Sequence, residues 1–172
     1  TFDDGYQNNL INAAPILAKF DFSATCYIVS DYIGLNNIWD LDKGISQIPL
    51  MTEGDISKWL NYGMDIGAHS KTHSNLTNIS ESEALKEIHD CKVELEGKFN
   101  IMINDFCYPY GLYNNKICKM VEDSGYLSAT SMDRGRVNLK STNLRLPRVP
   151  ITHHTLPHLF ISKILTKYED RR

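Results

Sequence analysis

Segments with the periodicity of a buried strand alternate with helix-like segments along the whole chain, and this alternation limits the possible folds most strongly. Strands are expected at residues 24–29, 64–68, 103–108 and 126–130, with a further extended segment at 144–151. Helices are expected at residues 9–19, 53–62, 80–99, 115–123 and 156–168. This order predicts a mostly parallel sheet with helices packed outside it, as an open sheet or a barrel. Reactive groups should then collect at the C-terminal ends of the strands.

Local signals mark the ends of several of these helices. Thr52 is a plausible N-cap, and Gly63 is expected to end the helix that Thr52 begins. Ser80 and Glu83 form a capping box, and one apolar stripe follows on that helix, made of Ala84, Ile88, Cys91 and Leu95. Residues 30–51 are irregular and form the longest expected loop.

The length and composition favour one domain over the whole of residues 1–172, because this length is too short for two well-filled cores. A net charge of −3 with 23% charged residues argues against a nucleic-acid-binding protein and against a disordered acidic tail. No stretch approaches the ~20 apolar residues that span a bilayer. The cysteines contain no C-x-x-C pair and are expected to be buried free thiols: Cys26, Cys91, Cys107 and Cys118.

The first chemical motif is Thr1-Phe2-Asp3-Asp4-Gly5. Two adjacent carboxylates at a strand end raise each other's pKa unless a cation lies between or beside them. The Asp-Gly pair is also typical of a simple turn. With a metal ion present, one aspartate could bind the ion while its neighbour acts as a general base.

The second motif is His69-Ser70-Lys71-Thr72-His73, which follows a predicted strand. Histidines four residues apart can converge on one point if the residues between them turn. Such a pair also occurs by chance. Together with Asp4, however, His69 and His73 would form a two-histidine, one-carboxylate site with open positions, the arrangement of a catalytic zinc or similar divalent metal.

The third motif is Tyr108-Pro109-Tyr110-Gly111, at the end of another predicted strand. It could be only a strand running into a turn. Alternatively, Pro109 and Gly111 shape a tight loop that presents an aromatic wall and a backbone N–H to a substrate. Such an N–H can stabilise an oxyanion.

In this order and at these separations, the three motifs resemble those of the polysaccharide deacetylases with a NodB homology domain, carbohydrate esterase family 4. The resemblance implies a distorted (β/α) barrel and hydrolysis of N-acetyl groups on amino-sugar glycans. It also implies a divalent metal, usually Zn²⁺, with Co²⁺ or Ni²⁺ as alternatives. By position, Asp3 would be the catalytic base, and the metal ligands would be Asp4, His69 and His73. The backbone N–H of Tyr110 would be the oxyanion donor, and the loop from Tyr108 to Gly111 would bind substrate.

The chain departs from the family pattern at two positions. Cys107 stands where many relatives have an arginine that orients the catalytic aspartate, so we expect Arg148, or second Arg145, to replace it. The family's acid histidine lies late in the chain in an L-x-H motif, which Leu156-Pro157-His158 matches at the start of a predicted helix. His158 is therefore a candidate acid, with the neighbouring histidines His153 and His154 as others.

The opening motif, the Y-P-Y-G loop and the L-P-R segment are most similar to the branch that acts on poly-N-acetylglucosamine. In that branch the acid histidine precedes the T-F-D-D-G strand. On this interpretation we expect an N-terminally incomplete domain, with a truncated first strand and the acid upstream of Thr1.

The expected partner is an N-acetylated glycan such as poly-N-acetylglucosamine, a chitin-like polymer or peptidoglycan. By resemblance, the protein would act outside the cytoplasm. Aromatic side chains that could form sugar platforms are Trp39, Tyr108, Tyr110 and Tyr113. Two alternatives remain: the same scaffold acting on O-acetyl esters or small amides, and a non-catalytic carbohydrate-binding protein.

Overall fold

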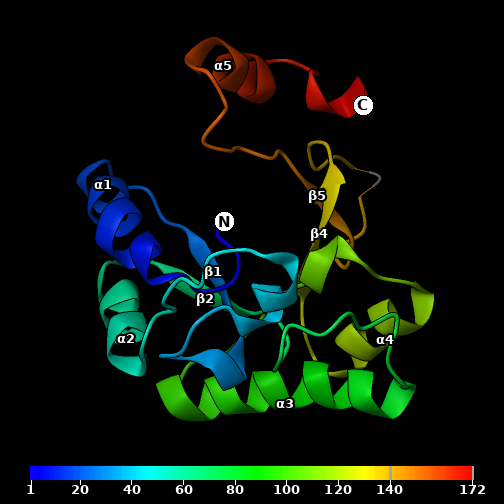
Figure 1. Ribbon diagram of the computed structural model, residues 1–172. Coiled ribbons are helices and arrows are strands. Elements are labelled where there is room, and N and C mark those ends of the chain that lie inside the picture. Colours follow the sequence, from blue (N-terminus) through cyan, green and yellow to red (C-terminus); the bar gives the residue numbers. More distant parts are fainter. Residues whose placement is uncertain (140, 172) are drawn as a thin grey trace.

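The protein is described by a computed structural model that covers residues 1–139 and 141–171. Its centre is a five-stranded parallel sheet in the order β1-β2-β3-β4-β5 (Figure 1). The strands are β1 (Thr25–Ile28), β2 (Asp65–Ala68), β3 (Asp105–Cys107), β4 (Ser128–Arg134) and β5 (Leu146–Arg148). Phe2 adds a parallel bridge to Cys26 at the free edge of β1. The expected α/β class with a parallel sheet is confirmed.

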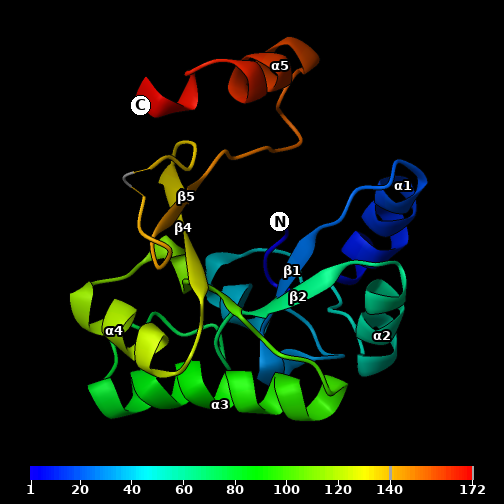
Figure 2. The ribbon, with the colours of Figure 1, turned by 180° about the vertical axis from the view of Figure 1, so that it is seen from behind.

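Helices alternate with the strands as far as β4. They are α1 (Ala14–Lys19), α2 (Glu53–Asn61), α3 (Glu81–Phe99), α4 (Asn115–Asp123) and α5 (Pro157–Leu165). Helices α1 to α4 lie around the sheet and α5 stands apart from it, as the front and back views show (Figures 1 and 2). Both predicted N-caps are present: Thr52 accepts from the backbone of Asp55, and Ser80 forms a capping box with Glu83. The predicted apolar stripe of α3 is its buried face.

The single helix expected at residues 9–19 is interrupted. A π-helical turn, Asn9–Ala13, precedes α1. Pro15 lies at the start of α1 and has no backbone N–H, so it cannot donate to the carbonyl one turn earlier. The missing hydrogen bond explains why one regular helix does not run through this segment.

The core lies between the sheet and helices α2, α3 and α4, and it is built from large apolar side chains. Trp59 is fully buried on α2 and donates from Nε1 to the backbone oxygen of Asp65 at 2.7 Å. Phe106 on β3 packs against the rings of Tyr108 and Tyr126. All four cysteines are buried and free, as predicted.

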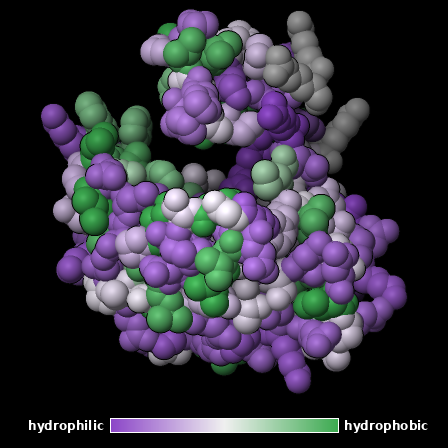
Figure 3. All heavy atoms as spheres, viewed as in Figure 1, coloured by the Kyte–Doolittle hydropathy of each residue, from purple (hydrophilic) through white to green (hydrophobic). Residues whose placement is uncertain are grey.

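Helices α1 and α5 carry many exposed apolar side chains, and a hollow separates α5 from the rest of the molecule (Figure 3). No residue of α5 is buried. Its Lys163 contacts the segments on either side of the helix: it donates to the Pro150 carbonyl at 2.7 Å and pairs with the buried Glu169 at 2.6 Å. Within the described ranges, no helix is both long enough and apolar enough to cross a membrane.

Gly67 lets the first three strands approach one another just before the second motif. A Cβ atom there would lie 2.6 Å from the ring of Tyr27 on β1 and 2.8 Å from the backbone oxygen of Asp105 on β3. We therefore expect Gly67→Ala to lower the free energy of unfolding by about 1–3 kcal/mol, as overpacked cores do.

Gly97→Ala is the matched control, because Gly97 is exposed on α3 and a Cβ there meets nothing within 4 Å. It should raise the free energy of unfolding by about 0.5–1 kcal/mol. Urea unfolding of both variants measures the difference. Equal stability of Gly67→Ala and the wild type would contradict the close packing of β1, β2 and β3.

Candidate active site

Asp4, His69 and His73 meet at the C-terminal ends of β1 and β2. Asp4 follows the segment that runs beside β1, and both histidines follow β2. The Asp4 Oδ1 atom lies 3.3 Å from Nε2 of His69 and 3.3 Å from Nε2 of His73. The side chains of Asp4, His69 and His73 are 21%, 3% and 6% exposed, so the cluster is largely withdrawn from solvent.

The backbone around this cluster is strained. Six non-glycine residues among those described have a positive φ, and four of them surround the cluster: Asp4 (70°), Ser70 (62°), His73 (61°) and Tyr110 (59°). The backbone N–H of His73 donates to Ser70 Oγ at 3.0 Å, which gives the serine of this motif a structural role. Such conformations cost about 1–3 kcal/mol each and tend to gather at functional sites.

The cluster fits a divalent metal ion. Ligand atoms held by one tetrahedral zinc at about 2.0–2.1 Å stand about 3.3 Å apart. This is the separation between Asp4 Oδ1 and each histidine nitrogen. Burial would raise the pKa of Asp4, but the hydrogen bonds to His69 and His73 outweigh it and lower that pKa, so the carboxylate is ionised. A mixed nitrogen and oxygen ligand set suits zinc, cobalt and nickel alike.

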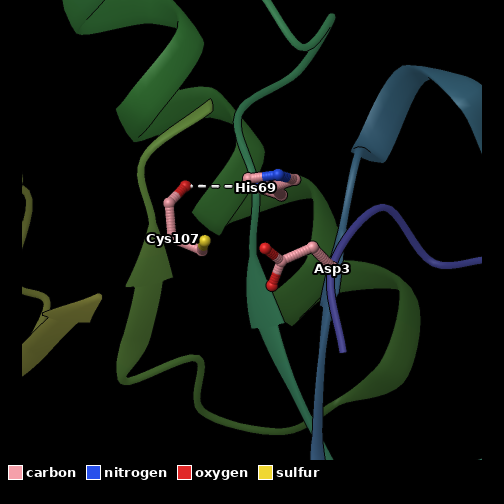
Figure 4. A group of neighbouring side chains, drawn as sticks. All are labelled: Asp3, His69 and Cys107. Carbon is pink, nitrogen blue, oxygen red and sulfur yellow. Dashed lines mark hydrogen bonds between the residues drawn. The ribbon is translucent and has the colours of Figure 1, made fainter. Parts of the chain in front are cut away.

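His69 is oriented by a backbone group of β3. Its Nδ1 lies 2.7 Å from the carbonyl oxygen of Cys107, the contact drawn as a dashed line in Figure 4. A proton on Nδ1 donates to this oxygen, and with a metal bound the Nε2 lone pair of His69 would be left to ligate it. Metal-binding histidines are commonly held in this way.

Asp3 lies beside this cluster but belongs to a different arrangement. Arg148 from β5 binds its carboxylate with two hydrogen bonds, Nη1 to Oδ1 at 2.6 Å and Nη2 to Oδ2 at 2.8 Å. Burial would raise the pKa of Asp3, but Arg148 and the charge of His69 hold it below its usual range. Arg145, the second candidate, instead donates to Asn115 at 2.6 Å. The geometry therefore pairs Arg148 with Asp3.

Cys107 explains how an arginine from β5 reaches Asp3. Its small buried side chain points toward Asp3 and His69 (Figure 4), and its Sγ lies 3.4 Å from Arg148 Nη2. Asp3, His69 and Cys107 also lie close enough together to hold a metal. The Arg148 guanidinium contacts two of these three residues, and a second cation there would be repelled. The group around Asp4 is thus the better metal site.

The loop from Tyr108 to Gly111 lies next to His73. The Tyr110 ring meets the His73 ring edge-on, with centroids 4.6 Å apart. Gly111 allows the loop to approach β4, since a Cβ atom would lie 2.5 Å from Met132. Tyr108 differs from the prediction: its ring is buried in the core, and its hydroxyl donates to the Leu144 carbonyl at 2.9 Å. It therefore cannot serve as a sugar platform.

Two glutamates on α3, which the sequence did not indicate as site residues, anchor the loop between the histidines. Glu87 accepts from the backbone N–H of Thr72 at 2.9 Å and from its hydroxyl at 2.7 Å. Glu94 accepts from Ser30 Oγ at 2.7 Å and pairs with Lys71. The two glutamates are seven residues apart on one helix face, a spacing that could have indicated them.

The three late histidines lie elsewhere. His158 is exposed on the first turn of α5, and His153 and His154 are exposed in the preceding turn, where their rings contact each other. No contact joins any of them to Asp3 or Asp4 in the part of the chain that the structure describes. The structure does not bring them to the cluster.

Comparison with known proteins assigns the chain to a family. The sequence model described as "Polysaccharide deacetylase" matches residues 1–129. The chain therefore belongs to the polysaccharide deacetylase family, which confirms the resemblance seen in the motifs.

A curated relative agrees with this assignment, and solved structures share the fold. The poly-beta-1,6-N-acetyl-D-glucosamine N-deacetylase of Staphylococcus aureus (strain MSSA476) is 26% identical over 160 residues, which are 92% of this chain and 55% of that protein. The Streptococcus pyogenes deacetylase PplD, solved in complex with acetate, superposes with a TM-score of 0.81 at 22% identity, covering 95% of this chain and 68% of that chain. The polysaccharide deacetylase BC0361 from Bacillus cereus gives 0.79 at 24% identity, covering 95% and 49%. The chain spans about half the length of the curated relatives it matches.

The anchor on α3 leads to a prediction about metal binding. Glu87→Ala removes both acceptors of Thr72, so the loop that carries His73 should lose its fixed position. We expect the dissociation constant for Zn²⁺, measured by calorimetry on metal-free protein, to rise about 10–100-fold. Lys86→Ala, at an exposed neighbouring position, is the control and should bind like the wild type. Unchanged affinity in Glu87→Ala would show that the anchor does not support the metal site.

Proposed function

We propose that this chain carries the catalytic centre of a metal-dependent N-deacetylase that acts on amino-sugar glycans. The observation that carries the proposal is the pairing of two neighbouring aspartates with different partners. Asp3 is bound by Arg148, whereas Asp4 faces His69 and His73. One carboxylate is thus placed to accept a proton and the other to bind a metal.

Asp4, His69 and His73 would hold the metal. When bound there, a divalent ion polarises an acetyl carbonyl and lowers the pKa of a coordinated water from 15.7 toward about 7. Because the three ligands leave open coordination positions, the site has the form of a catalytic rather than a structural metal centre.

Asp3 would act as the general base. Its lowered pKa keeps it ionised near neutral pH, and the two hydrogen bonds from Arg148 fix its carboxylate plane. It would take the proton from water as the water oxygen bonds to the acetyl carbon. The backbone N–H of Tyr110 would stabilise the resulting oxyanion. Asp3 would then return this proton to the leaving nitrogen, so that cleavage of the C–N bond yields the free amine and acetic acid, which ionises to acetate.

The proposed substrate is a β-linked N-acetylglucosamine polymer, with poly-N-acetylglucosamine as the first to test. The name of the Staphylococcus aureus relative supports this choice. Polymers of this class lie outside the cytoplasm, and we propose that the protein acts there. Trp39 and Tyr110, both partly exposed beside His73, border the cluster on the side that a sugar could approach.

Asp3→Asn tests the assignment of the base. We expect acetate release from N-acetylglucosamine oligomers by the full-length protein to fall about 10²–10⁴-fold, the usual contribution of a general base. The bound zinc, measured by elemental analysis, should stay the same, because Asp3 is not a ligand. Asp123→Asn, an exposed aspartate on α4, is the control.

Retained activity in Asp3→Asn would remove Asp3 from the reaction. Acetate release from acetylated xylan, but not from N-acetylated oligomers, would indicate an O-acetyl esterase instead. Glycan binding by the wild type without any acetate release would indicate a binding protein.

Arg148→Ala tests the orienting cation through the pH profile. Without Arg148, burial is no longer offset and the pKa of Asp3 rises, so its ionised form is lost at a higher pH. The acidic limb of the kcat/KM profile should move upward, and the rate should fall about 10²-fold from misplacement of the base. Arg145→Ala should not shift the acidic limb of the kcat/KM profile, since Arg145 contacts Asn115 and not Asp3. An unmoved limb in Arg148→Ala would contradict the pairing.

A further inference from the structure

The two histidines of the cluster are held in different ways. His69 has a backbone oxygen at its second ring nitrogen, the carbonyl of Cys107 at 2.7 Å. His73 Nδ1 is buried, and none of the described residues gives it a hydrogen-bond partner. Metal-binding histidines are normally oriented through this second nitrogen. Among the described residues, the ring contacts of His73 are therefore what can orient it.

The backbone of His73 does not provide that orientation. Its φ of 61° and its N–H bond to Ser70 Oγ at 3.0 Å fix the position of the Cα atom. The imidazole can still turn about its two side-chain torsions, and the torsion at the ring is broad. Small rotations there would move Nε2 away from Asp4.

Aromatic rings surround the His73 imidazole. The Trp39 indole stacks on it, with ring centroids 4.6 Å apart and an interplanar angle of 26°. Tyr110 and His69 meet it edge-on, with centroids at 4.6 Å and 4.9 Å. A flat ring stacked on the imidazole blocks rotation out of its plane, because the turning ring edge would collide with the indole.

Trp39 is itself fixed. It lies in a 3₁₀ turn, Ile38–Lys43, which follows the fully buried Asn37. The side-chain oxygen of Asn37 accepts from the backbone N–H of Ile48 at 2.6 Å, closing the loop. The Tyr32 ring packs edge-on against the indole at 5.2 Å. The indole is therefore a rigid support for His73.

We propose that Trp39 is a positioning residue for the metal site: its stacked ring orients His73 in place of the hydrogen bond that orients His69. This inference rests on the proposed function, which takes His73 as a ligand. Trp39 acts through His73, so its removal should weaken metal binding even when no glycan is present. A residue that served only as a sugar platform would affect glycan binding alone.

The test is a titration of the metal-free protein with Co²⁺, followed by its visible spectrum. Trp39→Phe keeps a flat ring, whereas Trp39→Leu keeps only apolar bulk. Ile38→Ala, an exposed neighbour in the same turn, is the matched control. Trp59 is then the remaining tryptophan in both Trp39 variants, and its buried emission reports that the core is folded.

We expect Trp39→Leu to raise the dissociation constant for Co²⁺ at least about tenfold and to alter the visible bands. Trp39→Phe should stay within about threefold of the wild type and keep its spectrum, and Ile38→Ala should match the wild type. Unchanged affinity and spectrum in Trp39→Leu would overturn the inference, even if KM for the glycan rises. An equal loss of Co²⁺ affinity in Trp39→Phe and Trp39→Leu would also overturn the inference, because a flat ring would then make no difference. If the wild type itself binds no Co²⁺, the proposed function fails, and the inference fails with it.

Discussion

The bidentate ion pair between Arg148 and Asp3 is the interaction on which the rest of the site depends. It joins β5, near the end of the chain, to the opening segment beside β1. Two adjacent carboxylates, both partly buried, would otherwise repel each other, and one would take up a proton. Because Arg148 neutralises Asp3 and the histidines face Asp4, both carboxylates stay ionised and take different roles.

The parallel sheet makes this division possible. Its strands end at one edge. The segment beside β1 and the ends of β2, β3 and β5 therefore each bring one part of the site to the same place. The surrounding elements then restrict these parts: Glu87 and Glu94 of α3 hold the loop between the histidines, and the turn that carries Trp39 covers His73. The strained backbone at Asp4, Ser70, His73 and Tyr110 persists because so many contacts act on it.

The features of the fold that could be predicted from the sequence are those set by short-range interactions along the chain. Capping by Ser80, the stripe of α3 and the alternation of strands and helices depend on residues close together in the chain. The contacts of Glu87 with Thr72 and of Trp39 with His73 join distant segments, and no short pattern encodes them. Tyr108 is a different case. Residues two apart on a strand share a face, so the buried Phe106 already indicated that Tyr108 points into the core.

Anomalous diffraction from crystals of the protein grown with zinc would show whether Asp4 binds the metal while Asp3 stays paired with Arg148. We expect one strong peak about 2.0–2.2 Å from Asp4, from His69 Nε2 and from His73 Nε2, with Asp3 still bound to Arg148. A peak at Asp3, His69 and Cys107, or an Asp3 carboxylate that has left Arg148 to bind the metal, would contradict this expectation.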